Sequence, residues 1–169
     1  MNTLRKCLWP IMVLFFISNL SAQDQAIQMS DAAPLTTELV MELKVNIGAP
    51  VTIGESDMGT RRFIPITGGE FVGKNIRGEV IPGGADWQLT RPDGITEVKA
   101  IYAIKTQDGA VIEVDNRGLV DRSDNSTYVR TVPTFKAPVG TYDWLNKRIF
   151  TGTITPGRGF VTIRVFLLL

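Results

Sequence analysis

The sequence predicts an all-β protein, a single antiparallel β-barrel of about nine or ten strands over residues 37–169. Short segments that alternate apolar and polar side chains recur along this part of the chain, with the period of two that strands require. Turns bearing Gly and Pro separate these segments. A closed barrel is favoured over an open sandwich because closure removes exposed sheet edges and gives the alternating faces a shared interior.

The first half of the predicted barrel contains four strand-like segments. Residues 39–47 alternate apolar and polar side chains without interruption, which is typical of a strand with one buried face. The segments 64–67, 71–82 and 87–90 follow, and the second of them is interrupted at Gly78. Two glycine pairs separate these segments, and glycine lets the backbone turn sharply, so we expect strand ends there.

Turn motifs organise the second half of the chain. Residues 91–94 read Arg-Pro-Asp-Gly, with Pro and Gly at positions that β-turns prefer. A strand at 96–105 then alternates cleanly, and a Gln-Asp-Gly turn at 107–109 leads into a return strand at 110–115. One face of the strand 96–105 carries Val98, Ala100, Tyr102 and Ile104. Further strands are expected at 128–132, 149–154 and 160–168, and one helical turn at 142–147.

Two segments precede the predicted barrel. Two basic residues, Arg5 and Lys6, are followed by an apolar run at 8–17 and then by small residues suited to a signal peptidase. We therefore expect 1–22 to be a secretory signal peptide and 23–36 to be a flexible lead-in; an uncleaved N-terminal anchor is the alternative. The protein is then expected to be exported, either periplasmic or secreted, with no stable membrane insertion after cleavage.

Charge and composition exclude several function classes. The chain has 18 basic and 17 acidic residues, and loss of the leader would leave 16 and 17, a net charge near −1. This balance gives no electrostatic reason to bind nucleic acid or an anionic membrane. There is no histidine, and the one cysteine, Cys7, lies in the leader, so the usual zinc sites and nucleophiles are excluded. We expect no cofactor and no metal, with only a hard cation on oxygen ligands left open.

Five short motifs occur in order along residues 39–169. They read Ile66-Thr67-Gly68-Gly69-x-Phe71, Gly83-Gly84-Ala85-Asp86-Trp87, Asp108-Gly109-Ala110-x-Ile112, Tyr128-x-Arg130-Thr131-x-Pro133 and Tyr142-x-Trp144-Leu145-Asn146. With these motifs in register, the chain resembles a widespread family of small proteins catalogued only as a domain of unknown function, also placed among uncharacterised protein families. The resemblance implies one β-barrel of about nine or ten strands and no assigned activity. Many members of that family are cytoplasmic and have no leader, from which this chain departs.

The candidate catalytic residues are two acids that each follow a glycine pair. Asp86 stands next to Trp87, so it would act as a general base or bond a ligand hydroxyl beside a stacking surface. The structural alternative is that Asp86 caps a turn and Trp87 fills the core. Glu70 follows the earlier glycine pair in the same way. If Glu70 and Asp86 converge in an apolar site, their like charges push one pKa upward.

The other candidates are aromatic, cationic or amide side chains. Arg130 shares a face with Tyr128; if that face points inward, Arg130 needs a carboxylate partner or binds a ligand oxyanion. Tyr102 is either a core tyrosine or a proton donor. Trp144 and Asn146 either pack on the core and bond backbone, or contact a ligand. The predicted ligand-binding residues are Trp87, Tyr102, Tyr128, Arg130, Trp144 and Asn146.

Three functions remain open on this basis. The leading hypothesis is an exported β-barrel that binds a small, partly apolar, oxygenated molecule in its interior, in a pocket lined by Trp87, Tyr102, Arg130 and Asp86. The second is a metal-free cyclase, isomerase or dehydratase that uses carboxylate acid–base catalysis. The third is a structural or interaction protein of the cell envelope, which an exposed apolar patch would favour. The expected partner is a small-molecule ligand and not nucleic acid, and the sequence indicates no oligomeric state.

Overall fold

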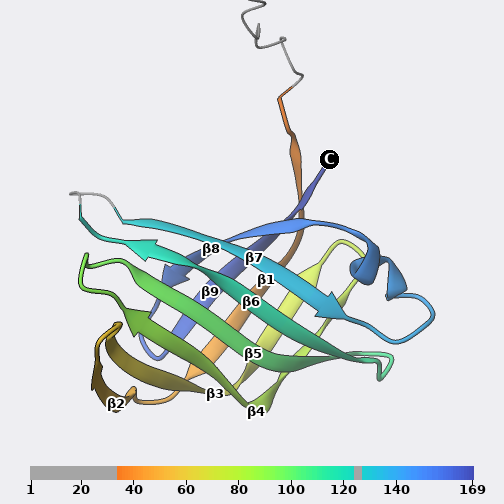
Figure 1. Cartoon of the computed structure of the whole chain (residues 1–169). Coiled ribbons are helices and arrows are strands. Elements are labelled where there is room, and N and C mark those ends of the chain that lie inside the picture. Colours follow the sequence, from red (N-terminus) through yellow and green to blue (C-terminus); the bar gives the residue numbers. More distant parts are fainter. Residues whose placement is uncertain (1–33, 124–126) are drawn as a thin grey trace, which may run out of the picture. The chain divides into compact units, whose positions relative to one another are not determined.

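The computed structural model describes residues 34–123 and 127–169 (Figure 1). The expected signal peptide and most of the expected lead-in therefore lie outside the described residues. The described strands are β1 (Thr37–Ile47), β2 (Val51–Ser56), β3 (Gly59–Gly73), β4 (Arg77–Thr90), β5 (Thr96–Thr106), β6 (Val111–Asp121), β7 (Tyr128–Lys136), β8 (Phe150–Pro156) and β9 (Phe160–Leu168). A short 3-10 helix, η1 (Asp143–Lys147), joins β7 to β8.

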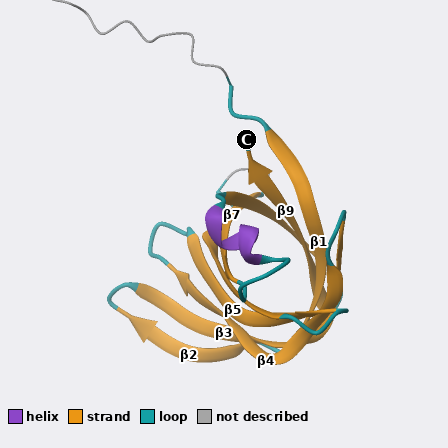
Figure 2. Ribbon diagram, turned by 90° about the vertical axis from the view of Figure 1, so that its right-hand side faces the viewer, coloured by secondary structure: helices purple, strands orange, loops and turns teal. Residues whose placement is uncertain are grey.

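Eight of these strands close into an antiparallel barrel. The strand order is β1-β9-β8-β7-β6-β5-β4-β3, and β3 pairs back onto β1 to complete the ring. Figure 2 looks into this ring from one end. The ninth strand, β2, pairs with β3 alone and extends the sheet outside the ring. The prediction of an all-β protein with one antiparallel barrel is confirmed, although β2 was not among the predicted strands.

The two glycine pairs lie inside strands, which corrects the strand ends expected there. β3 continues through Gly68-Gly69 and β4 continues through Gly83-Gly84. The pairing register shifts at both places, and three of these four glycines have φ between 114° and 137°, which L side chains rarely adopt. Bulges of this kind bend a strand instead of ending it, so β3 and β4 curve around the barrel. The predicted segments 64–67, 71–82 and 87–90 are therefore parts of two long strands.

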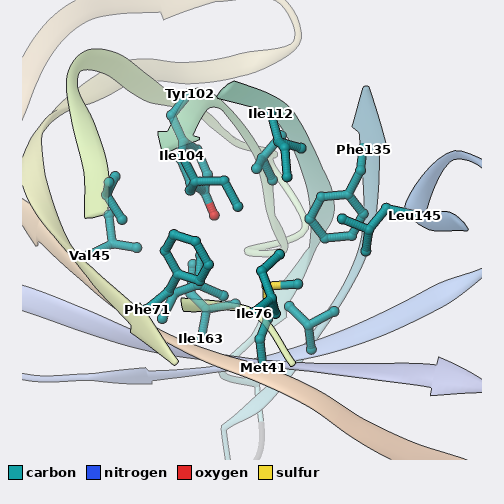
Figure 3. Close-up of a cluster of buried hydrophobic side chains, with 14 of the residues drawn as sticks. Met41, Val45, Phe71, Ile76, Tyr102, Ile104, Ile112, Phe135, Leu145 and Ile163 are labelled. Atoms are coloured by element: carbon teal, nitrogen blue, oxygen red, sulfur yellow. The ribbon is translucent and has the colours of Figure 1, made fainter. Parts of the chain in front are cut away.

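A cluster of buried apolar side chains fills the barrel at the end that carries η1 (Figure 3). Leu145 of η1 is 1 % exposed and belongs to this cluster, so η1 closes that end of the ring. The members labelled in Figure 3 are Met41, Val45, Phe71, Ile76, Tyr102, Ile104, Ile112, Phe135, Leu145 and Ile163. Within residues 34–123 and 127–169, no helix is long and apolar enough to cross a membrane.

The joint between β7 and β8 has the fewest paired residues in the ring. Its register contains one pair, Thr131 with Gly152, whereas β6–β7 has nine pairs and β8–β9 has seven. Pro133 adds to this weakness because it has no N–H to donate to a neighbouring strand.

We expect the backbone amides of β8 that face β7 to exchange with solvent faster than those between β5 and β6, because they lack a ladder of hydrogen bonds. Native-state hydrogen exchange followed by NMR measures this difference residue by residue. Equal protection along both joints would contradict the expectation.

Candidate functional site

The inner face of the barrel carries three polar residues between two apolar clusters. We call Asp86 on β4, Asn116 on β6 and Thr131 on β7 the polar layer. Toward η1, the inner-face residues of these strands belong to the large cluster described above. Toward the opposite end lies a smaller cluster. It consists of Val98, Val120 and Val129, with Ile154 packed against it. The polar layer therefore separates the two apolar clusters.

Strand pairing brings the members of the polar layer together. Ala100 pairs with Asp86 on one side and with Asn116 on the other. Neighbouring strands lie about 4.8 Å apart, so the Asp86 and Asn116 backbones are roughly 10 Å apart across a residue with a one-carbon side chain. Asn116 also pairs with Pro133, two residues from Thr131 on the same face. Asn116 and Thr131 are thus diagonal neighbours on adjacent strands.

Two glycines lie beside the Thr131 hydroxyl. Gly118 on β6 and Gly152 on β8 are the strand partners of Thr131. A Cβ atom at Gly152 would lie 2.4 Å from Thr131 Oγ1, a distance that real Cβ contacts do not show. Glycine at this position therefore leaves the space that the hydroxyl occupies.

Each member of the polar layer has a buried oxygen without a hydrogen-bond partner in the described part of the chain. These atoms are Asp86 Oδ1, Asn116 Oδ1 and Thr131 Oγ1. Asn116 is 2 % exposed and Thr131 is 1 % exposed. Native proteins pair the large majority of buried polar groups, so three such oxygens in one layer require an explanation. The polar layer is therefore the candidate site that the interior of the barrel offers.

The second oxygen of Asp86 is held by a short chain of side chains. Gln88 Nε2 donates to Asp86 Oδ2 at 2.5 Å, and Arg62 Nε donates to Gln88 Oε1 at 2.8 Å. Because the Gln88 carbonyl accepts from Arg62, its NH₂ group must face Asp86. The Asp86 carboxyl is therefore fixed through Oδ2, and Oδ1 is buried without a partner in the described part of the chain.

Burial perturbs two titratable groups on this inner face. It raises the pKa of Asp86, and hydrogen bonds from Gln88 and the Lys99 backbone, together with the charge of Arg62, offset this only in part. Burial also raises the pKa of Tyr102, and the negative charge of Asp86 adds to that rise. Figure 3 shows the Tyr102 hydroxyl oxygen directed into the barrel. Tyr102 therefore keeps its proton at ordinary pH and is a donor near Asp86.

Asp86→Asn is expected to remove a pH-dependent loss of stability. Folding raises the pKa of Asp86 from its ordinary 3.8, so the native state binds this proton more tightly than the unfolded state. The resulting stability is fully present below pH 3.8 and is lost as pH rises through the native pKa. Urea denaturation between about pH 3 and pH 7 should show the variant gaining stability relative to the parent as pH rises. A difference that does not change with pH would contradict this.

Trp87 lies on the outer face, away from the polar layer. It is 44 % exposed and packs against Phe63, with the ring centroids 5.0 Å apart. Successive residues of a strand point to opposite faces, so an inward Asp86 requires an outward Trp87. The expected pocket that combines Asp86 with Trp87 is therefore wrong in this respect.

Arg130 and Tyr128 also lie on the outer face. Tyr128 is 53 % exposed, and the Arg130 guanidinium lies 5.1 Å from the centre of its ring. Arg130 Nη1 donates to the Val129 carbonyl oxygen at 2.7 Å. The expectation of an inward Arg130 paired with an interior acid is wrong, because the strand turns Thr131 inward instead.

Glu70 does not meet Asp86. It is exposed on the outer face, where it pairs across strands with Lys44 and Glu79. A groove of about 730 Å³ lies there, and Asp86, Asn116 and Thr131 are not among its lining residues. Its lining includes Glu42, Lys44, Glu70, Val72, Arg77, Glu79, Lys105 and Gln107. The proposed pairing of the two carboxylates is corrected: the register shift within β3 and β4 separates them.

Trp144 and Asn146 have structural contacts at the η1 end. Trp144 packs against the large cluster, with its ring centre 6.0 Å from that of Phe150. Asn146 Oδ1 accepts from the Ala137 N–H at 2.8 Å, and Asn146 Nδ2 donates to the Ala137 carbonyl oxygen at 2.9 Å. Both residues therefore make the contacts that the structural alternative describes.

Asn116, Thr131, Gln88 and Arg62 were not predicted as site residues. One pattern in the sequence does reveal Asn116: it continues the inward alternation of Ile112 and Val114, but the predicted strand ended before it. Arg62 and Gln88 are recognisable only once β3 and β4 are paired.

Residues 35–168 match the family model described as Protein of unknown function (DUF3237). A UPF0311 protein from Clostridium acetobutylicum is 38 % identical over 128 residues, covering 67 % of this chain and 81 % of that protein. The hydroalkoxylation enzyme phnH from Penicillium herquei is 31 % identical over 124 residues, covering 73 % of this chain and 77 % of that enzyme. A crystal structure of a beta-barrel like protein from Acinetobacter baumannii aligns with a TM-score of 0.77 at 27 % identity, covering 83 % of this chain and 100 % of the other.

Proposed function

We propose that the barrel of this chain, which belongs to the family described as Protein of unknown function (DUF3237), binds a small, partly apolar, oxygenated molecule and moves a proton on it through Asp86. The five sequence motifs indicate the same family. The observation that carries this proposal is Asp86 Oδ1. It is buried, has no partner among the described residues, and belongs to a carboxyl with a raised pKa. A raised pKa keeps a carboxyl protonated closer to neutral pH, which suits a general acid.

The reaction class in this proposal is the addition of an O–H group across a C=C bond, since one relative is named a hydroalkoxylation enzyme. Protonated Asp86 donates its proton to one alkene carbon, so the π bond breaks and positive charge develops on the other carbon. The hydroxyl oxygen of the substrate bonds to that carbon, and its proton passes to the Asp86 carboxylate. Substrate and product are isomers, Asp86 regains its proton, and no oxidant is consumed.

Neighbouring side chains support this role. Gln88 holds Asp86 Oδ2, which leaves Oδ1 as the proton-transferring oxygen. The Tyr102 hydroxyl lies near enough for the charge of Asp86 to raise its pKa, and as a donor it stabilises the carboxylate formed after proton transfer. The apolar clusters on both sides of the polar layer exclude water, which would otherwise capture the cation as an alcohol.

The entrance in this proposal is the end of the barrel that carries β2. Gln88 and Arg62 are half-buried and lie between Asp86 and that end, since Arg62 pairs with β2. The opposite end is closed by Leu145 of η1.

The test uses ortho-methallylphenol, a phenol with a neighbouring alkene, incubated with the full chain in deuterated buffer. The expected product is a dimethyl-dihydrobenzofuran that carries one new deuterium in a methyl group, formed well above the rate in buffer. NMR and mass spectrometry detect both features. Glu79→Gln is the matched control, because it removes an exposed carboxylate from the outer face of the same strand and should change nothing. Ring closure no faster with protein than without it would refute the proposal.

A further inference from the structure

The proton transfer assigned to Asp86 leaves two members of the polar layer without a role. Asn116 and Thr131 are diagonal neighbours on β6 and β7, and both are almost completely buried. Neither Asn116 Oδ1 nor Thr131 Oγ1 has a hydrogen-bond partner in the described part of the chain. Burying such groups without partners costs free energy, so their retention in an apolar interior points to a function.

With the Asn116 amide oriented as it is, the two oxygens suit one kind of ligand group. Asn116 Oδ1 is an acceptor and needs a donor, whereas the Thr131 hydroxyl donates as well as accepts. A hydroxyl group satisfies both at once, because its hydrogen goes to Asn116 and its oxygen accepts from Thr131. An ether or a ketone oxygen has no hydrogen to donate to Asn116.

Resting on the proposed function, we propose that Asn116 and Thr131 form a second subsite that binds a non-reacting hydroxyl of the substrate. The substrate is then a ring compound with at least two hydroxyl groups, one of which reacts at Asp86. Ala100, which pairs with both Asp86 and Asn116, places only a one-carbon side chain between them. The apolar clusters on either side of the polar layer cover its faces.

The position of Gly152 supports the same assignment. A side chain at Gly152 would displace the Thr131 hydroxyl, since its Cβ would come within 2.4 Å of Oγ1. The fold therefore keeps open a place for a hydroxyl that bonds nothing else in the described residues.

The test compares two probes, ortho-methallylphenol and the matching methallylresorcinol, which adds one hydroxyl. The parent is expected to prefer the resorcinol in kcat/KM by about 10²-fold, because a site built to bond a hydroxyl rejects the analogue that lacks it. Thr131→Val and Asn116→Leu should bring this ratio close to one, chiefly by slowing the resorcinol. Thr131→Ser restores the hydroxyl and should restore the preference. Val132→Ala, an outer-face change on the same strand, is the matched control and should keep the ratio.

Thermal melting separates a binding role from a structural one. If the two side chains serve the ligand, replacing unpaired buried oxygens with apolar groups of similar shape should leave the Tm unchanged or raise it. A Thr131→Val variant that melts well below the parent would assign the hydroxyl to the fold and overturn the inference. A parent with no preference for the resorcinol, or a Thr131→Val variant that keeps the preference, would overturn it as well.

Failure of the proposed function gives a different pattern, in which the parent cyclises neither probe. In that case, binding of resorcinol itself tests the second subsite. This binding is measured from the Asn116 side-chain amide signals in NMR spectra of the full chain. Binding that Thr131→Val abolishes and Val132→Ala leaves intact supports the second subsite. Absent binding, or equal binding in both variants, overturns it.

Discussion

Asp86→Asn is expected to reduce turnover of ortho-methallylphenol by about 10²- to 10⁴-fold, the range that a positioned general acid contributes. Asparagine keeps the shape of the side chain but has no proton of suitable acidity to give to an alkene carbon. The Gln88 amide can still contact its carbonyl oxygen, so the barrel should remain folded. Steady-state kinetics together with far-ultraviolet circular dichroism measure the two effects separately.

The pH profile of the parent provides the matching control. Because protonated Asp86 is the donor, kcat should be high at acid pH and fall as pH rises through the raised pKa of this carboxyl. The residual activity of Asp86→Asn should lack that fall. Equal turnover in variant and parent, or the same fall in both, would remove Asp86 from the mechanism.

Gly69→Ala is expected to destabilise the barrel by about 3 kcal/mol or more, with a fall in Tm of roughly 10 °C. Gly69 has a φ of 137°, and a Cβ there would lie 2.1 Å from the Lys44 carbonyl oxygen. The variant therefore suffers both backbone strain and a collision with the β1 backbone, at the bulge where β3 bends. Urea denaturation and calorimetry measure the loss.

Gly83→Ala isolates the strain from the collision. Gly83 has a φ of 114°, but a Cβ there meets nothing within 4 Å. The Gly83→Ala variant should lose only about 1 kcal/mol of stability, the cost of a strained backbone alone. Equal losses of stability in Gly69→Ala and Gly83→Ala would show that the collision with the β1 backbone contributes nothing.

The strands that the sequence predicted best are those whose alternation is uninterrupted. The predicted strand 96–105 is observed at Thr96–Thr106, and 160–168 is observed at Phe160–Leu168. In such segments the apolar residues of the alternating pattern are the ones that lie on the buried face of the strand. The segments around the glycine pairs were predicted as separate strands because local sequence cannot distinguish a bulge from a turn. That distinction depends on the pairing with β1 and β5, which is tertiary.

The candidate site was predictable only in part. Asp86 and Tyr102 were singled out from the sequence, and the structure places them near each other inside the barrel. Trp87 and Arg130 were assigned to the same pocket although each stands next to an inward residue, so alternation alone places them outside. Asn116 and Thr131 could not be recognised as partners, because their strands are joined by a register that the sequence does not show.

The single residue pair between β7 and β8 has a consequence for how the ring comes apart. Opening that joint would leave every other strand pair in place, so the cylinder would unroll into one continuous open sheet. The chain crosses this joint through the segment that contains the 98 % exposed Val139, while β1 and β9 remain paired elsewhere. A circular permutant with its new termini in that segment would keep every other strand pairing of the barrel.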